Sequence, residues 1–227
     1  MKLLSVNVSL PKEVQNNGKT MTTGIFKEPV KKRVMLRTMN LGGDGQADLV
    51  GHGGIYKAVY VYSIENYEYW KSELSRNDFT YGQFGENFTV EGMLEDEIHI
   101  GDVFRVGGAL VEVTQPRVPC AKLGFKMGMA KFPKLFLQNS RVGFYLRVLE
   151  EGEVGAGDVI ERVKVDAERM TVREINHLLY FDQKNLEGAK KALRIRALSP
   201  GWRGSFKERS AKNSKEPLES VDCCSGR

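Results

Sequence analysis

The most regular feature of the chain is an alternation of apolar and polar residues over short runs. Near the N-terminus, Leu4, Val6, Val8 and Leu10 occupy every second position. Because successive side chains of a strand point to opposite faces, this pattern predicts a half-buried strand. Comparable runs predict a strand pair at 24–30 and 32–37 and further strands at 58–62, 98–106, 109–114, 143–148 and 158–163, whereas the polar stretch 12–21 predicts a loop.

The turns between these runs are marked by glycine. Gly107 and Gly108 separate two alternating runs and predict a tight β-hairpin. Ser63 precedes an apolar helical pattern, and such helices are few before residue 163. Roughly seven to ten closely spaced strands with abundant turns predict a mainly β fold, a closed or near-closed β-barrel over residues 1–163.

The pattern changes to a helical one from about residue 164. Thr171 and Glu174 have the spacing of a capping box, with Thr171 as the residue that begins a helix. Residues 186–194 predict a second helix and 202–209 a third, shorter one. We therefore expect a small C-terminal helical domain over residues 164–210, followed by a polar, flexible tail over 211–227.

Composition limits the class of protein. The chain has 227 residues, of which 41% are hydrophobic, and its formal net charge is +5. Apolar runs are too short for a membrane span, and the first ten residues do not resemble a secretory signal. Cys120 is the one cysteine before the last five residues, so we expect no disulfide framework and a cytoplasmic location. The positive charge is spread along the chain without a nucleic-acid-binding motif, so we expect no nucleic-acid partner.

The segment 114–124 carries the strongest candidate chemistry. Cys120 lies between two cations, Arg117 and Lys122, on a loop stiffened by Pro116 and Pro119. Positive charge stabilises a thiolate, which is the form of cysteine that attacks and that ligates metal. The alternative is that Cys120 is a small buried side chain, as most free cysteines are. From the local residues alone, both interpretations remain open.

Two glycine-rich stretches are further candidates. Residues 41–54 include His52 between Gly51 and Gly53, but contain neither a phosphate-binding loop nor a dinucleotide-binding turn. His52 could face a ligand or bond nearby backbone in a turn. Residues 82–90 present Glu86 and Asn87 just before a strand, either to a ligand or within a tight turn.

Four sequence blocks in this order resemble the MOSC domain, the family named after the C-terminal domain of molybdenum cofactor sulfurases. They read GDGQADLVGHGGIYKAVYVY (43–62), GQFGENFTVEGM (82–93), IGD (100–102) and TQPRVPCAKL (114–123). The helical C-terminus resembles the three-helix appendage of the YiiM-like branch, so the likeness spans roughly residues 1–210. One position departs from the pattern, because Tyr56 precedes Lys57 where the resemblance predicts an aspartate.

The resemblance implies a β-barrel that binds a molybdenum cofactor. Cys120 would be the catalytic residue and the thiolate ligand of molybdenum, or a carrier of sulfane sulfur. Arg117 and Lys122 would hold the pterin phosphate by paired hydrogen bonds and by charge. The further residues that we expect to bind the cofactor are His52, Lys57, Asn87, Gln115 and Glu86.

The resemblance also implies two functions of different classes. The first is an oxidoreductase that reduces N-hydroxylated small molecules, such as N-hydroxylated purine bases, with electrons from a separate flavoprotein reductase. The second is a sulfur carrier or cofactor-handling protein with a persulfide on Cys120. The chain has no room for the pyridoxal-phosphate domain of a complete sulfurase, and it could assemble as a homodimer.

Overall fold

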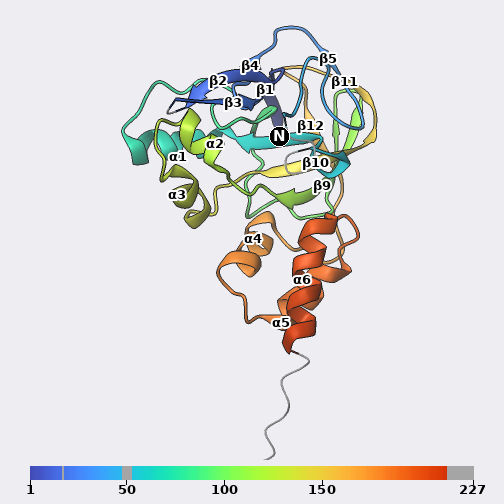
Figure 1. Cartoon of the computed structure of the whole chain (residues 1–227). Helices are drawn as coiled ribbons and strands as arrows, with labels where there is room; N and C mark the ends of the chain where they lie inside the picture. Colours follow the sequence, from blue (N-terminus) through green and yellow to red (C-terminus); the bar gives the residue numbers. More distant parts are fainter. Residues whose placement is uncertain (17, 48–52, 214–227) are drawn as a thin grey trace, which may run out of the picture.

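The fold is built around one large sheet, with helices on one flank and a separate helical unit below it (Figure 1). We describe residues 1–16, 18–47 and 53–213 of a computed structural model. The strands, in chain order, are β1 (Lys2–Val8), β2 (Lys12–Asn16), β3 (Lys19–Thr23), β4 (Glu28–Pro29), β5 (Val34–Leu36), β6 (Val59–Ser63), β7 (Phe88–Glu91), β8 (Val103–Val106), β9 (Ala109–Pro116), β10 (Phe144–Glu150), β11 (Gly152–Val154) and β12 (Ile160–Lys164).

Eight of these strands form the main sheet, in the order β12-β8-β9-β10-β6-β7-β1-β4. β6 and β7 pair in parallel, whereas the other neighbours in this sheet run antiparallel. The predicted hairpin is confirmed, because β8 and β9 pair across Gly107 and Gly108. The apolar residues of the alternating runs form the core, for example Val111 and Val113 of β9, which are fully buried.

The expected closed barrel is not formed by the described strands. β1 and the start of β12 are joined only by an isolated bridge between Lys2 and Val159 and by nearby backbone hydrogen bonds. The second half of β1 pairs with β4 instead, so the sheet curls round without a continuous ladder across the seam. The mainly β character is confirmed, and the closure is corrected.

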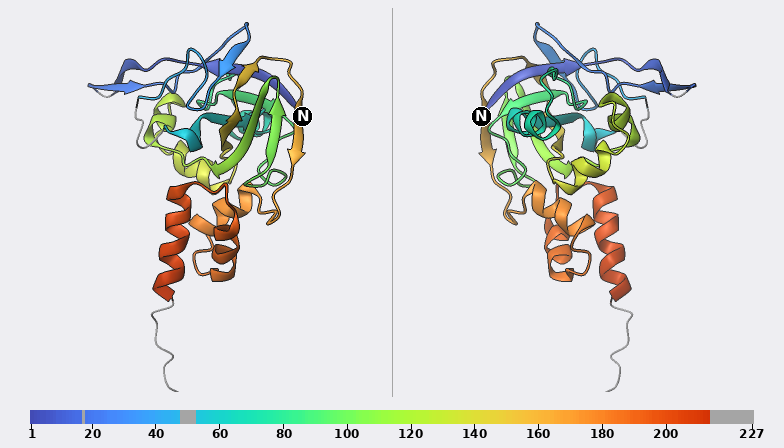
Figure 2. Two further views of the ribbon diagram at one scale, coloured as in Figure 1. Left: turned by 90° about the vertical axis from the view of Figure 1, so that its right-hand side faces the viewer. Right: turned by 90° about the vertical axis from the view of Figure 1, so that its left-hand side faces the viewer.

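Two local predictions are wrong, and a third is wrong in part, because the strand expected over 98–106 begins only at Val103. The polar stretch expected as a loop forms the antiparallel ribbon β2–β3, which projects from the sheet (Figure 2). Its side chains are mostly exposed on both faces, so it has no apolar alternation to reveal it. The runs at 24–30 and 32–37 do not pair with each other, because β4 pairs with β1 and β5 pairs with β11.

Three short helices cover one flank of the sheet near β6. They are α1 (Ile64–Leu74), α2 (Ala121–Lys126) and α3 (Phe132–Gln138). An aromatic cluster fills the space between them and the sheet, in which Tyr62, Phe84 and Phe136 have ring centroids within 6 Å of one another. This packing fixes α2, the helix that follows Cys120.

The C-terminal helices form a unit on the side of the sheet where β9 lies (Figures 1 and 2). They are α4 (Val172–Tyr180), α5 (Leu186–Arg194) and α6 (Pro200–Asn213). The predicted capping box is confirmed: the Thr171 side chain accepts from the Glu174 N–H, and the Glu174 carboxylate accepts from the Thr171 N–H. The third helix is not the shorter one expected over 202–209, because α6 is longer than α4 and α5. It extends three residues past Ser210, and the rest of the expected tail lies outside the described residues.

Candidate functional site

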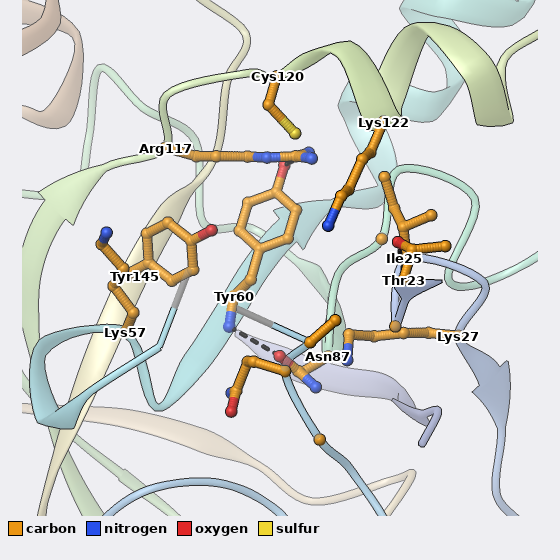
Figure 3. Close-up of a pocket in the computed structure, with 15 residues that line it drawn as sticks. Thr23, Ile25, Lys27, Lys57, Tyr60, Asn87, Arg117, Cys120, Lys122 and Tyr145 are labelled. Carbon is orange, nitrogen blue, oxygen red and sulfur yellow. Dashed lines mark hydrogen bonds between the residues drawn. The ribbon is translucent and has the colours of Figure 1, made fainter. Parts of the chain in front are cut away.

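Cys120 sits at the junction of a strand and a helix. β9 ends at Pro116, the chain runs through residues 117–119, and Cys120 immediately precedes α2. Its backbone is extended and its side chain is partly exposed. In Figure 3 the sulfur points towards the guanidinium group of Arg117. The prediction for the two prolines holds in part: Pro119 lies in the loop between β9 and α2, whereas Pro116 is the last residue of β9 and is paired with Phe144.

Arg117 lies beneath the sulfur and is held in one place. Its side chain is buried, and its Nη1 donates to the carbonyl of Phe84 at 2.7 Å and to Oη of Tyr60 at 3.1 Å. The guanidinium carbon also lies 4.5 Å from the centroid of the Tyr60 ring. A planar cation on an aromatic face with two fixed acceptors is preorganised, so it loses little freedom when it binds an anion.

Arg117 and Cys120 interact electrostatically. Burial alone would lower the pKa of Arg117, but Tyr60, Tyr145 and Cys120 together raise it above its ordinary value. Burial raises the pKa of Tyr145, against the opposing effect of Arg117. Burial also raises the pKa of Tyr60. Both tyrosines that neighbour Arg117 therefore remain neutral at physiological pH. The positive charge of Arg117 therefore faces the sulfur, where it stabilises a thiolate.

The opposite wall is a buried polar network around Asp44. Lys27 forms an ion pair with Asp44, and the Asp44 carboxylate also accepts from Nδ2 of Asn87 at 2.9 Å. Oδ1 of Asn87 accepts from the backbone N–H of Tyr60 at 3.1 Å, the bond drawn in Figure 3. Burial lowers the pKa of Lys27 even though Asp44 opposes the shift. Asn87 thus joins the start of β6 to the Asp44 loop and positions this wall.

Two more lysines add positive charge. Nζ of Lys122 donates to the carbonyl of Thr22 at 3.2 Å and points into the cavity in Figure 3. Lys126, one turn further along α2, donates to the carbonyls of Ile25 and Gly82 at 2.9 and 2.5 Å. Burial lowers the pKa of Lys126 from 10.5 to about 8. Lys122 therefore ties α2 to the end of β3, and Lys126 ties it to the loop that follows β3.

Most of these groups, but not Asp44 or Lys126, line a narrow cavity of about 90 Å³. The charged side chains that line it are all cationic, Lys27, Lys57, Arg117 and Lys122, and the described lining includes no carboxylate. Over the described residues, no group of three or more histidine, cysteine, aspartate or glutamate side chains could hold a metal ion. The cationic lining of the cavity therefore suits an anionic group.

Comparison with known proteins supplies the family. Residues 48–161 match the MOSC domain, and residues 170–212 match the YiiM-like, 3-alpha helix domain. The chain belongs to the MOSC domain family. The second match shows that it is a YiiM-like member, which confirms the resemblance read from the four sequence blocks.

Individual relatives agree with this assignment. The chain is 44% identical over 217 residues to the uncharacterized protein YflK of Bacillus subtilis, covering 96% of this chain and 97% of YflK. The crystal structure of YiiM from Geobacillus stearothermophilus superposes with a TM-score of 0.79 at 35% identity, covering 92% of this chain and 98% of that one. A protein named reductase from Gibberella moniliformis is 29% identical over 165 residues, which is 71% of this chain and 29% of that protein.

The predicted MOSC site residues separate into three groups. The first lines the cavity and comprises Cys120, Arg117, Lys122, Lys57 and Asn87. The second consists of Glu86 and Gln115, which lie close to the cavity without lining it. Glu86 is buried and accepts from the N–H groups of Gly82 and Phe84, and Gln115 lines an adjoining cleft. The third is His52, which lies outside the described residues.

The sequence analysis missed three ionisable residues of the cavity. Tyr60 and Tyr145 belong to adjacent strands, with ring centroids 5.4 Å apart, and both had been read only as strand residues. Lys27 comes from a run that was read as part of a strand pair. A polar tip on an otherwise apolar strand was the available signal for the tyrosines.

Tyr56 occupies the position before Lys57 where an aspartate was expected. Tyr56 lies in a 3-10 helix, η1 (Ile55–Lys57), and its ring lies 5.5 Å from the guanidinium carbon of Arg147. Its carbonyl accepts from Oγ1 of Thr114 at 2.7 Å.

In the described part of the chain, we find no helix long and apolar enough to cross a membrane.

Proposed function

We propose that this MOSC protein is a molybdenum-cofactor-dependent reductase of N-hydroxylated compounds, with Cys120 as the thiolate ligand of the metal. The observation that carries the proposal is the position of Cys120 over Arg117 in a cavity whose charged lining is cationic. The relative named reductase supports an oxidoreductase function.

The residues present fit the cofactor by their chemistry. A lone protein thiolate holds a metal only if the other ligands come with the metal, as they do in an organic metal cofactor. Arg117 offers a rigid, planar guanidinium group with paired N–H donors to an anionic group such as a phosphate, and Lys122 offers a mobile ammonium group. The narrow cavity suits the metal end of the cofactor and one anionic group. When bound, the cofactor would supply the two electrons that convert an N–OH group and two protons into N–H and water.

The protein would contribute position and charge. Cys120 would fix the metal end, because its backbone is set by Pro119 on one side and α2 on the other. The protonated hydroxyl groups of Tyr60 and Tyr145 keep negative charge away from the thiolate. The Lys27–Asp44–Asn87 network holds the facing wall, so that the cavity needs little rearrangement on binding.

We further propose that electrons come from a separate flavoprotein reductase. The similarity to the Gibberella reductase covers 29% of that protein, so most of it lies outside the shared domain. A chain with three cysteines, of which two lie in the last five residues, lacks the ligands for an iron–sulfur cluster of its own.

Elemental analysis for molybdenum tests this function. Wild type, Cys120→Ala and the double variant Cys223→Ala/Cys224→Ala would be purified from a host that makes the cofactor. We expect molybdenum in wild type and in the tail variant and its loss in Cys120→Ala, with loss of reduction of an N-hydroxylated purine. The Cys120→Ala protein should melt within a few degrees of wild type, because the thiol is partly exposed.

The opposite result would change the function proposed. Molybdenum retained by Cys120→Ala would contradict ligation at this residue. If wild type holds no molybdenum but carries a persulfide that Cys120→Ala lacks, seen as an added sulfur mass, the protein is a sulfur carrier instead.

A further inference from the structure

A second hollow lies where the helical unit meets the β-domain. It is a cleft of about 540 Å³, within the range of roughly 300–1,000 Å³ typical of small-molecule sites. Its lining comes from the 3-10 helix η1, from the end of β9 and the loop after it, and from the facing ends of α4 and α6. Lys57 lines both this cleft and the cysteine cavity, so the two hollows adjoin.

The walls of the cleft are mainly aromatic and aliphatic. Tyr180 of α4 and Trp202 of α6 meet edge to face with ring centroids 6.1 Å apart, and Tyr56 also lines the cleft. At the rim, the apolar side chains of Ile55 and Val118 are 44% and 45% exposed. A pocket with aromatic walls and an open apolar rim suits a flat ring that enters from solvent.

One buried polar group in the cleft is unused by the protein. Ser199 is 3% exposed, and among the described residues its hydroxyl has no hydrogen-bond partner. Both backbone groups of Ser199 form hydrogen bonds. Its N–H donates to the carbonyl of Thr114 at 3.3 Å, and its carbonyl accepts from the N–H of Arg203 at 2.9 Å. A buried hydroxyl without a partner is unfavourable, and a ring nitrogen or amino group of a ligand would satisfy it.

We propose that this cleft binds the planar nitrogen heterocycle of the substrate, and that the C-terminal helical unit thereby determines substrate specificity. The inference rests on the proposed reductase function, to which it adds the site of the ring. Trp202 and Tyr180 supply the wall, Ser199 supplies a hydrogen bond, and the adjoining cavity receives the hydroxylated nitrogen next to Cys120.

The cleft fits the substrate better than the cofactor. Lys57 is its one charged side chain among the described residues, whereas the cysteine cavity has four cations for an anionic group. The exposed rim also gives the free exchange with solvent that a substrate needs and a resident cofactor does not.

Two glycines of α6 provide a matched test. A Cβ added at Gly201 or at Gly204 meets no described atom within 4 Å, so both positions have room for a side chain. Gly201 lines the cleft, and Gly204 does not. Gly201→Phe should therefore fill the cleft, and Gly204→Phe is the control on the same helix. Ser199→Ala is a third variant that removes the unpartnered hydroxyl with little change in stability.

The primary readout is binding of adenine, the product expected from an N-hydroxylated adenine, to the purified holoprotein by titration calorimetry. This measurement needs no turnover, so it remains valid if the reductase proposal fails. We expect Gly201→Phe to weaken binding by at least about tenfold and Ser199→Ala by about three- to tenfold, with Gly204→Phe unchanged. Molybdenum content should be equal in all four proteins.

Three results would overturn the inference. The first is no binding of adenine to wild type, and the second is equal binding by wild type and Gly201→Phe. The third is loss of molybdenum in Gly201→Phe alone, which would assign the cleft to the cofactor. If reduction is absent while the binding pattern holds, the reductase function fails and the heterocycle site stands.

Discussion

The guanidinium carbon of Arg117 lies 4.5 Å from the centre of the Tyr60 ring, and its Nη1 donates to the hydroxyl of the same tyrosine at 3.1 Å. Strand β6 therefore positions the cation that faces Cys120, although Arg117 belongs to the loop after β9. Because Tyr60 also donates its backbone N–H to Asn87, one residue joins the cationic floor of the cavity to its polar wall.

Replacing Arg117 by lysine tests whether shape as well as charge is needed. Lysine keeps the charge but loses the planar guanidinium group and its stacking on Tyr60. We expect molybdenum content or reductase activity to fall by at least about tenfold, with a loss of about 1–3 kcal/mol in the free energy of unfolding. Arg141→Lys is the control, because Arg141 stacks on Tyr69 at 4.2 Å outside the cavity. Equal effects of the two substitutions would contradict a specific role for Arg117.

Lys126 should make stability depend on pH in the alkaline range. Burial lowers its pKa in the folded protein from 10.5 to about 8. Between those two values the unfolded chain binds more protons at this residue than the folded one, so its contribution to the free energy of unfolding rises with pH over that window. Denaturant titrations at pH 7, 8, 9 and 10 should show a rise in wild type that Lys126→Met lacks. Parallel curves would show that Lys126 titrates normally.

Glu86 should prove structural. Its carboxylate accepts from the N–H of Gly82 at 2.8 Å, from the N–H of Phe84 at 3.0 Å and from Oγ1 of Thr89 at 2.8 Å, and Tyr67 donates to it as well. Glu86→Ala would leave these donors without a partner, so we expect a loss of at least about 3 kcal/mol in unfolding free energy.

Two further measurements complete this test. Glu86→Gln should lose less than Glu86→Ala, and Glu91→Gln, at an exposed position, should change stability little. Folded Glu86→Gln protein should keep its molybdenum. Loss of the metal at unchanged stability would instead support direct binding of the cofactor by Glu86.

The capping box of α4 gives a prediction for the helical unit. The side chain of Thr171 accepts from the Glu174 N–H at 3.1 Å. Thr171→Ala should therefore lower the free energy of unfolding by about 1 kcal/mol, a shift of roughly 2–4 °C in Tm. Thr171→Ser keeps the acceptor and should stay close to wild type. A melting curve of Thr171→Ala identical to that of wild type would show that the cap adds nothing.

The fold was predictable from sequence where one face of an element is buried. β9 and β10 carry clean alternation, and α4 carries a full capping box, so these elements were predicted to within about two residues. The strand expected over 98–106 was too long, because β8 begins only at Val103. The β2–β3 ribbon was missed because it buries little on either face. The seam between β1 and β12 could not be predicted, since it depends on which distant backbone groups meet once the sheet has curled.

The candidate site was predictable where its residues are neighbours in the chain. Cys120, Arg117 and Lys122 lie within six residues of one another, so charge beside a thiol was visible in the sequence. Tyr60, Tyr145 and Lys27 reach the same cavity from three other segments. A polar tip on an apolar strand is the one local signal for the two tyrosines, and it does not show which residues they meet, because that depends on sheet order and on burial.

The hydrogen bond from Ser199 to the carbonyl of Thr114 has a consequence for the order in which the protein matures. Strand β9 and the cysteine loop leave the ribosome well before the helical unit, since synthesis proceeds at about 5–20 residues per second. Thr114 therefore gains this partner only when the last helix is being made. A nascent chain can fold its sheet early, yet the wall beside Cys120 is finished among the final steps of translation.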